Sequence, residues 1–590
     1  MTKFYQKIKN IHRKIIKKKK HNWFLIFSLT FFIVSLGCLY AFRFESYLIY
    51  ERVVFQSSNM TLYADLYHPT NQVSFQQKAP LIIFAHGLGS QKDLDPRVPN
   101  EFTKRGFYVA SIDYRGDGES GGHLLDINTN MYMNRTNIPS IAQDCSRLLD
   151  TLSNMNFFIN INTSQIGLVG HSLGGMVALM NGALDDRFKL TVTWAGLVNF
   201  SAEFFGISED HPFMKYIPAR IINETNPSNL MVIHSIYDTT VPFNENALVA
   251  KNLTNCKLVE IKSHLFGGPH YLFSDQVISE TIKWVELHFF NSETKNGPIR
   301  LSYVITYILI GSSFIGLFLT TLAIMKYSFK YFSIKNDPDK RKKVNSSTIT
   351  DKISNRKHII FVVLCFSGFL TLWIIMLKLF GLTSLLTTPI IFLIGYFLYI
   401  LIKYIITAEI KGEKISVYIE LRLKDEIKSQ FHKKVMLYSI LSSAIFLVLY
   451  ISFSLTYPFA FFSPVNLLSY ILTFEIYPFY LAMELFYRKI LYPKLDFIKS
   501  AKNKTIFISL LEMINIFILF YFSSPLFLIS AMLVTYMIFL AVMVMNSIIY
   551  ERTNKFSSVM ISSFIIIQIF FGSVVSTILG FGSIVKLLHV

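Results

Sequence analysis

The feature that most constrains this chain is a series of long apolar runs that fills its second half. A helix needs about 20 apolar residues to cross the hydrocarbon core of a bilayer. Runs of that order cover 302–325, 358–379, 383–403, 436–457, 466–487, 505–521, 525–548 and 558–586. Residues 301–590 are therefore predicted to form a membrane domain with about eight transmembrane helices.

One more apolar run, residues 23–42, lies near the N-terminus. It follows a basic tail, residues 1–22, that holds nine Lys and Arg residues. A cleaved signal peptide is the alternative interpretation, but the run is long for a signal core and no small-residue cleavage motif closes it. We predict a retained transmembrane anchor behind a cytoplasmic tail.

The distribution of charge decides what the formal net charge of +19 means. Residues 43–300 contain 20 Lys and Arg against 25 Asp and Glu, whereas the rest of the chain contains 37 against 13. The excess of basic residues lies in the tail and in the connections 326–357, 404–434 and 488–504. This is the pattern of the positive-inside rule, which predicts that residues 43–300 lie outside the cytoplasm. It makes the lipid bilayer the expected partner and argues against binding of nucleic acid.

Residues 43–300 have a different character, because short apolar runs alternate with longer helical patterns. Strands buried on both faces are predicted at 81–85, 106–113, 165–170, 190–196 and 230–235, and a further short strand at 257–261. Amphipathic stretches such as 138–152 fall between them. This alternation predicts an α/β domain with a doubly wound, mostly parallel sheet and helices on both of its faces.

The sequence GHSLG, with Gly170, Ser172 and Gly174, interrupts this alternation between a predicted strand and a predicted helix. A sharp strand-to-helix turn exposes a serine hydroxyl above the sheet, and small neighbours let the backbone pass closely. The helix that follows favours developing negative charge at its N-terminus. Ser172 is thus a candidate nucleophile; the alternative is a glycine-rich turn with an incidental serine.

A serine nucleophile needs a base and a carboxylate that orients the base. Asp238 comes just after the predicted strand 230–235, and His270 follows the turn Gly-Gly-Pro in the next loop. His264, in the same loop, is the alternative base, but it lies almost at the end of a strand and has less reach. The order Ser172, Asp238, His270 along the chain is that of a nucleophile-elbow enzyme.

Acyl transfer also requires donors for the oxyanion of a tetrahedral intermediate. The backbone N–H groups of Leu173, which follows the serine, and of Leu88, in AHGLGS, are the candidates. No metal-ligand motif occurs, and no metal or cofactor is expected. Cys145 and Cys256 are predicted to be buried thiols, with a disulfide as the alternative.

The segments HGLGS, DYRGDGESGG, GHSLGG, YDTTVP and GGPH, in this order, resemble the α/β-hydrolase superfamily. Its dienelactone-hydrolase-like, monoglyceride-lipase-like and serine-aminopeptidase-like branches are the most similar. The resemblance covers about residues 50–290 and implies serine hydrolase chemistry, with structural roles for Asp113, Arg115 and His171. Unlike many members with a large lid, this chain leaves only residues 200–229 for one or two short helices over the serine.

The function expected from these features is that of a membrane-bound serine hydrolase that cleaves carboxylic esters, with lipid or acyl esters as candidate substrates. A peptidase or thioesterase would use the same residues. An alternative of another class is a transporter or receptor-like protein whose hydrolase-like domain only binds a ligand.

Three acidic residues, Glu475, Glu484 and Glu512, fall within predicted spans, where a carboxylate is costly and is a functional candidate. Glu484 lies near a basic connection, so its carboxylate is expected to reach the membrane surface. Glu475 and Glu512 are expected to contact each other or a ligand, or to help pack helices.

Overall fold

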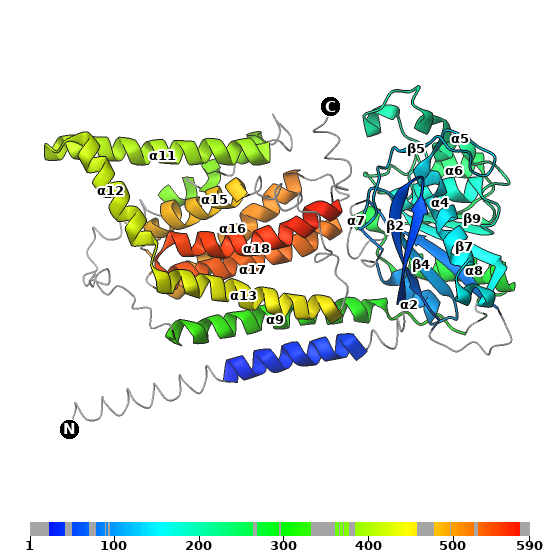
Figure 1. Ribbon diagram of the computed structural model, residues 1–590, viewed down its shortest axis with the longest axis horizontal. Coiled ribbons are helices and arrows are strands. Elements are labelled where there is room, and N and C mark those ends of the chain that lie inside the picture. The colour runs from blue at the N-terminus through cyan, green and yellow to red at the C-terminus, as the bar shows by residue number, and fades with distance from the viewer. Residues whose placement is uncertain are drawn as a thin grey trace.

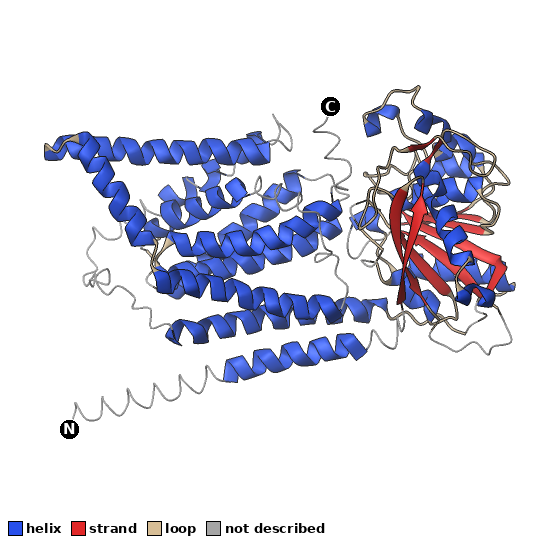
Figure 2. Ribbon diagram, in the orientation of Figure 1, coloured by secondary structure: helices blue, strands red, loops and turns tan. Residues whose placement is uncertain are grey.

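The protein consists of an α/β part and a purely helical part, which lie beside each other (Figures 1 and 2). The computed structural model describes residues 23–41, 50–69, 78–88, 90–92, 95–262, 268–293, 295, 297–331, 360–364, 366–369, 371–376, 384–456, 477–495, 497–498, 500–523 and 529–578. All strands of the described residues precede residue 262, and the helical part follows from α9 (Tyr303–Tyr331) onward.

An eight-stranded sheet forms the centre of the α/β part, in the order β1-β2-β4-β3-β7-β8-β9-β10. Its strands are β1 (Tyr50–Ser57), β2 (Met60–Tyr67), β3 (Ala79–Ala85), β4 (Tyr108–Asp113), β7 (Ile161–His171), β8 (Leu190–Trp194), β9 (Leu230–Ser235) and β10 (Lys257–Ile261). Strands β1 and β4 both run antiparallel to β2, and all other pairs in this sheet are parallel. The predicted fold class, an α/β-hydrolase-like and mostly parallel sheet followed by an all-helical region, is confirmed.

The six predicted strands coincide with β3, β4 and β7 to β10, but two parts of the prediction differ from the structure. The antiparallel hairpin β1–β2 at one edge of the sheet was not predicted. The stretch 138–152 is not one helix, because it begins with the short strand β6 (Ile138–Pro139) and becomes α-helical only at α3 (Asp144–Ser153). Pro139 accounts for the extended backbone at Ile138, since the residue before a proline avoids helical backbone angles, and the 3-10 helix η1 (Ser140–Gln143) then leads into α3.

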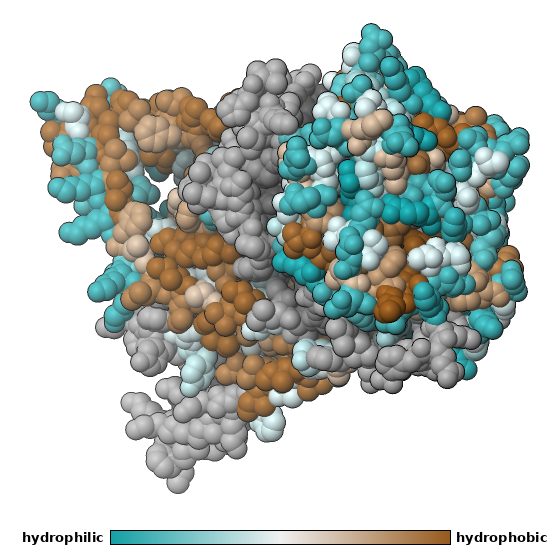
Figure 3. All heavy atoms as spheres, turned by 45° about the vertical axis from the view of Figure 1, so that its right-hand side comes forward, coloured by the Kyte–Doolittle hydropathy of each residue, from teal (hydrophilic) through white to brown (hydrophobic). Residues whose placement is uncertain are grey.

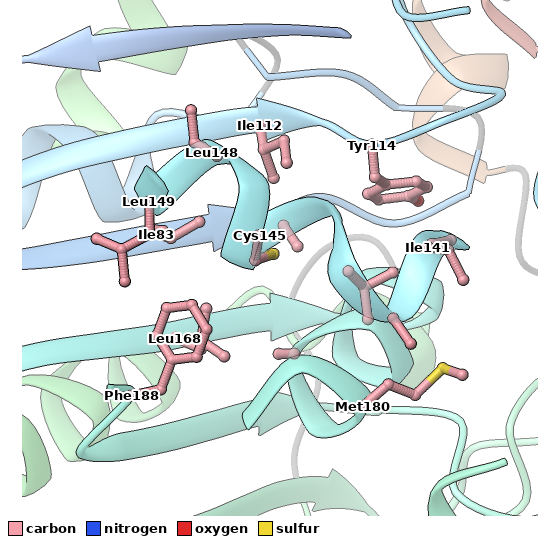
Figure 4. Packing of buried hydrophobic residues seen from close by; sticks show 14 of the residues in the cluster. Ile83, Ile112, Tyr114, Ile141, Cys145, Leu148, Leu149, Leu168, Met180 and Phe188 are labelled. Carbon is pink, nitrogen blue, oxygen red and sulfur yellow. The ribbon is translucent and has the colours of Figure 1, made fainter. Parts of the chain in front are cut away.

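Alternate residues of β3 pack into two separate hydrophobic clusters, one on each face of the sheet. Ile83 belongs to the cluster that includes Leu148 and Leu149 of α3 (Figure 4), whereas Ile82 and Phe84 belong to the opposite cluster. The first face is covered by α3 and α4 (Leu173–Leu184), and the second by α2 (Arg97–Thr103) and α8 (Asp275–Phe290). Successive side chains of a strand point to opposite faces, so helices on both sides bury the sheet completely.

The helical part contains several long helices packed side by side (Figure 1). After α9 they are α11 (Ser384–Lys411), α12 (Ile415–Gln430), α13 (Lys433–Thr456), α15 (Tyr477–Leu485), α16 (Ala501–Ser523), α17 (Ile529–Thr553) and α18 (Phe556–Ile578). Within the described residues, four helices are long and apolar enough to cross a membrane: Trp23–Ala41, Tyr303–Phe329, Thr387–Lys411 and Lys433–Ser452.

Other predicted spans differ in how far the structure describes them. Helices α16, α17 and α18 overlap the predicted spans 505–521, 525–548 and 558–586, whereas much of 466–487 lies outside the described residues. The connection 404–434 is helical, since α11 continues to Lys411 and α12 follows. The sequence of α12 is rich in Glu, Lys, Leu and Arg, which favour helix even where no apolar stretch is present.

Helix α9 begins inside the α/β part and is fixed there by polar contacts. The Glu101 carboxylate of α2 accepts hydrogen bonds from the backbone N–H groups of Ser302 and Tyr303, both at 2.8 Å. The Tyr303 hydroxyl donates to Asp275 at the start of α8, at 2.7 Å. A side chain from α2 therefore satisfies N–H groups at the start of α9 that have no partner within their own helix.

Candidate active site

Ser172 occupies the sharp turn between β7 and α4. Its backbone has φ 54° and ψ −118°, a conformation that non-glycine residues rarely adopt. A Cβ atom at Gly170 would collide with the backbone of Gly174, and one at Gly174 would collide with the carbonyl groups of Ala85 and His86. The glycines therefore allow the tight approach that strains Ser172 and leaves its hydroxyl at the edge of the sheet.

The side chains of Ser172, His270 and Asp238 form one continuous hydrogen-bonded row. His270 Nε2 lies 2.8 Å from Ser172 Oγ, and His270 Nδ1 lies 2.8 Å from Asp238 Oδ2. The three residues are between 3% and 7% exposed. Because an ionised carboxylate only accepts hydrogen bonds, Nδ1 carries the proton, and Nε2 is free to accept from the serine. The structure thus brings together the three residues that the sequence predicted.

Asp238 is held ionised by donors on several sides. Its Oδ1 accepts the backbone N–H groups of Thr240 at 2.9 Å and Val241 at 3.0 Å, and His234 Nε2 lies 3.4 Å from Oδ2. Burial alone would raise the pKa of Asp238, but the hydrogen bonds from His234 and His270 hold it well below its usual value. A charged carboxylate in this position stabilises an imidazolium at His270.

The two predicted oxyanion donors lie beside the serine. Leu173 is the first residue of α4, where backbone N–H groups lack a partner within the helix. A Cβ atom at Gly87 would lie 2.8 Å from His171 Nδ1 and 3.4 Å from Ser172 Cβ, so the loop that carries Leu88 runs next to the nucleophile. The placement suits the donor roles of Leu173 and Leu88, which remain predictions.

A network of hydrogen bonds and ion pairs holds the loop after β3, which carries Leu88. Asp113 accepts from the Lys92 backbone N–H at 2.6 Å and from Lys92 Nζ at 2.9 Å, and Tyr114 donates its hydroxyl to the His86 carbonyl at 3.0 Å. Burial would raise the pKa of Asp113, but Lys92 and His86 lower it. Asp113 therefore supports the loop after β3 and does not face the serine hydroxyl.

Arg97 is a supporting residue that no sequence pattern indicated. It is fully buried, with its guanidinium 4.6 Å from the ring centres of both Trp194 and Phe273. It pairs with Asp95 at 2.6 Å and donates to the Leu272 carbonyl at 3.1 Å. Arg97 thereby fixes the segment that follows His270. An arginine at the start of a helix is usually exposed, so this role depends on the tertiary structure alone.

His171 also supports the candidate base. Its Nε2 lies 3.1 Å from the backbone carbonyl oxygen of His270. Burial, together with the nearby His270 and Arg97, lowers the pKa of His171 to about 3. His171 is therefore neutral near pH 7, and its Nε2–H donates to the His270 carbonyl without placing a second positive charge beside the base. This agrees with the structural role expected for it.

Some sequence-based expectations concern other positions around the site. The alternative base His264 lies outside the described residues. The segment 200–229 contains the short helices η3 (Ala202–Phe205), η4 (Pro212–Tyr216) and α5 (Pro218–Ile221). Cys145 and Cys256 are buried free thiols, as predicted. In the described part of the chain, no group of three or more His, Cys, Asp or Glu is placed to hold a metal ion.

Comparison with known proteins gives one family match and several relatives that match part of the chain. A model of the prolyl oligopeptidase family matches residues 96–268, which include Ser172 and Asp238. An uncharacterized 31.7 kDa protein from the traX-finO intergenic region of Escherichia coli is 34% identical over 120 residues, 20% of this chain and 37% of that protein. The platelet-activating factor acetylhydrolase of Cavia porcellus is 24% identical over 147 residues, 19% of this chain and 34% of that enzyme.

Among solved structures, the acylaminoacyl peptidase of Pyrococcus horikoshii is similar over 44% of each chain, with 17% sequence identity and a TM-score of 0.33. The matched part of the present chain spans just over a third of the length of the two curated relatives. Together with the sheet topology, the family match supports placing the α/β part in the α/β-hydrolase superfamily. The branch within that superfamily remains a prediction.

Proposed function

We propose that the protein is a membrane-bound serine hydrolase that cleaves carboxylic esters through Ser172, His270 and Asp238. The observation that carries this proposal is the position of His270, which lies 2.8 Å from both the nucleophile and the orienting carboxylate. A domain that only binds a ligand has no need of such an alignment, so it also argues against a receptor-like or transporter-like domain without catalysis.

The proposed reaction follows from this geometry. Ser172 Oγ attacks the carbonyl carbon of the ester while His270 Nε2 takes the hydroxyl proton. The N–H groups of Leu173 and Leu88 stabilise the oxyanion. Collapse of the intermediate breaks the bond to the alcohol, which receives the proton from His270 and leaves an acyl-Ser172 intermediate. Water then attacks the acyl group by the same route and frees the carboxylic acid and the serine.

An ester is proposed as the substrate, with a peptide or thioester as the second candidate. The similarity to an acetylhydrolase supports an ester, whereas the match to the prolyl oligopeptidase family supports a peptide. Leu88, beside the serine, and Tyr237, next to Asp238, are 44% and 57% exposed. Apolar side chains at these positions would suit an acyl chain, which is why lipid or acyl esters are included.

The proposed location in a membrane is supported by the surface of the helical part. Helix α11 is apolar along its length, yet none of its most apolar window is buried inside the protein. Ile391, Ile394 and Phe397 on this helix are each more than half exposed. Figure 3 shows broad hydrophobic areas over the helical part and a mostly hydrophilic surface over the α/β part. Apolar surface of this extent suits contact with lipid.

Labelling with a fluorophosphonate probe tests the proposed nucleophile. The purified full-length protein should be labelled, and Ser172→Ala should abolish the labelling, because the probe reacts only with an activated serine. Ser164→Ala, which changes an exposed serine of β7, should be labelled like the wild type. Equal labelling of the wild type and Ser172→Ala would show that Ser172 is not the nucleophile.

Protease treatment of intact cells tests the proposed orientation, in which residues 43–300 lie outside the cytoplasm. The basic tail and the connection 326–357 should stay inside under the positive-inside rule. Added protease should therefore cut the α/β part and spare 326–357. Cleavage of 326–357 with protection of the α/β part would reverse the orientation and place the substrate in the cytoplasm.

A further inference from the structure

A second cluster of buried charged side chains lies within the helical part, away from the proposed active site. Glu484 comes from α15, Arg488 from the π-helical turn η9 (Phe486–Leu491) and Glu512 from α16. The three residues are 5%, 1% and 2% exposed. Glu484 is therefore buried, and the expectation that its carboxylate reaches the membrane surface is wrong. We call these three residues the Glu-Arg-Glu cluster.

One guanidinium serves both carboxylates of this cluster. Arg488 Nε donates to Glu484 Oε2 at 3.0 Å, and Arg488 Nη2 lies 2.7 Å from Glu512 Oε1. Glu512 thus pairs with Arg488, whereas Glu475, its predicted neighbour, lies outside the described residues. In the part of the chain that the structure describes, no other basic side chain forms an ion pair with either carboxylate.

The cluster consequently carries one negative charge in excess when both carboxylates are ionised. The other titratable groups that interact with it among the described residues are phenols, and none supplies a positive charge: Tyr477 and Tyr480 of α15, Tyr487 of η9 and Tyr550 of α17. Helix α18 contributes the hydroxyl of Ser563, which accepts a hydrogen bond from Asn546 Nδ2 beside the cluster. An uncompensated charge inside a helical bundle is strongly unfavourable, because burial removes it from water.

Several oxygen atoms around the cluster lack a hydrogen-bond donor. Among the described residues, both carboxylate oxygens of Glu512 and the amide oxygens of Asn515 and Asn546 have no hydrogen-bond partner. All three side chains are at least 98% buried. Glu512 Oε1 still has the Arg488 Nη2 contact at 2.7 Å, so three of these acceptors have no donor beside them in the described part of the chain. Most buried polar atoms in proteins are hydrogen-bonded, and three such acceptors near an excess negative charge need an explanation.

The orientation of the Asn546 amide follows from its carboxylate partner. Asn546 Nδ2 lies 2.7 Å from Glu484 Oε1, and an ionised carboxylate only accepts, so the nitrogen must face it. The same nitrogen lies 2.7 Å from Ser563 Oγ. Asn515 Nδ2 lies 2.8 Å from the Tyr487 hydroxyl. The amide nitrogen of Asn546 is therefore used, and its oxygen has no partner among the described residues.

The backbone at Arg488 is also unusual. A π-helical turn within a helix is rare and occurs frequently at functional sites, because it changes the direction of the side chains that follow it. Here the turn covers Phe486–Leu491 and therefore contains the one cation of the cluster. It follows α15 directly and is followed by the 3-10 turn η10 (Tyr492–Lys494), so Arg488 lies where this helix ends.

We propose that the helical part binds one positive charge, a proton or a monovalent metal cation, at Glu512. Either ligand neutralises the excess charge of the Glu-Arg-Glu cluster. A proton would make Glu512 a donor to one of the free oxygens, whereas a metal cation would be coordinated by several of them. This site is independent of the proposed hydrolase activity, and it gives the helical part a function beyond holding the α/β part at the membrane.

Infrared difference spectroscopy of the full-length protein in lipid nanodiscs tests the proton. Spectra taken between mildly acidic and mildly alkaline buffer should show the carbonyl band of a protonated carboxylic acid. Glu512→Gln should remove that band, and Glu420→Gln, which changes an exposed glutamate of α12, should retain it. A band that disappears in Glu512→Gln and does not respond to added salt identifies the ligand as a proton.

Thermal unfolding in sodium or potassium chloride, at fixed pH and total ionic strength, tests the metal cation. One of the two ions should raise the melting temperature of the wild type in a saturable way, since a ligand that binds only the folded state stabilises it. Glu512→Gln should abolish this dependence. Asn515→Ala, which keeps all three charges, should weaken the apparent affinity at least tenfold and serves if Glu512→Gln does not fold.

The two measurements together can overturn the proposal. If the wild type shows neither a carboxylic acid band nor an ion-dependent melting temperature, no positive charge binds. The same conclusion follows if Glu512→Gln retains whatever the wild type shows, or if Asn515→Ala leaves an ion-dependent melting temperature unchanged. The Glu-Arg-Glu cluster would then be a fixed network that packs helices together. None of these outcomes depends on Ser172 labelling, so this proposal and the proposed hydrolase activity are tested independently.

Discussion

Asp238 in the α/β part and Glu512 in the helical part are both buried carboxylates, but their surroundings differ. Asp238 accepts hydrogen bonds from His270 and from two backbone N–H groups. Glu512 has the Arg488 guanidinium nearby and no hydrogen bond from the described residues. Asp238 lies in a loop at the end of a strand, where backbone N–H groups are free to donate.

Glu512 lies in the middle of α16, where each backbone N–H is used by the helix itself. A carboxylate in such a place can be satisfied only by side chains or by a bound ligand. A loop at the edge of a sheet can supply backbone N–H donors to a buried carboxylate, whereas the middle of a helix cannot. This is why the two parts lead to different proposals: a complete hydrolytic site in one, and a site that lacks a positive charge in the other.

The largest expected effect concerns the complete site. His270→Ala should lower kcat/KM for ester hydrolysis by more than about 1,000-fold, because nucleophile and base act as a unit. His264→Ala is the matched control from the same loop and should retain most of the activity. Steady-state kinetics on a small soluble ester measure both. If His264→Ala loses activity and His270→Ala retains it, the base is His264 and the proposed assignment is wrong.

The next effect concerns the incomplete site. Arg488→Met should destabilise the protein by about 3–5 kcal/mol, because it leaves two buried carboxylates without the one basic side chain that pairs with them among the described residues. The triple variant Glu484→Gln, Arg488→Met, Glu512→Gln removes all charge and should recover most of this loss. Arg422→Met, on the exposed face of α12, is the control. Melting temperatures in nanodiscs measure these differences, and equal melting temperatures for the wild type and Arg488→Met would contradict the account.

The smallest effect concerns the junction between the two parts. Glu101→Ala removes the acceptor for the first N–H groups of α9 and should cost about 1–2 kcal/mol. Hydrogen exchange should accelerate at Ser302 and Tyr303, while the exposed Glu245→Ala should behave like the wild type. Unchanged exchange at these two residues would show that Glu101 does not hold the start of α9.

The features that depend on neighbouring residues could be predicted from the sequence alone. Runs of Val, Ile and Leu bounded by turns located β3, β4 and β7 to β10, since a parallel sheet covered on both faces needs apolar side chains on both. Glycines on both sides of Ser172 located the elbow, because only small residues fit so tight a turn. Asp238 and His270 followed from their places after predicted strands, where parallel strands bring their carboxyl ends to one edge.

Which distant side chains come into contact is seen only in the tertiary structure. The position of Arg97 between Trp194 and Phe273, and the contact between Arg488 and Glu512, join residues from different segments of the chain. Local patterns specify which face of a helix or strand is buried. They do not specify which element lies against that face, because this depends on how all the elements pack at once.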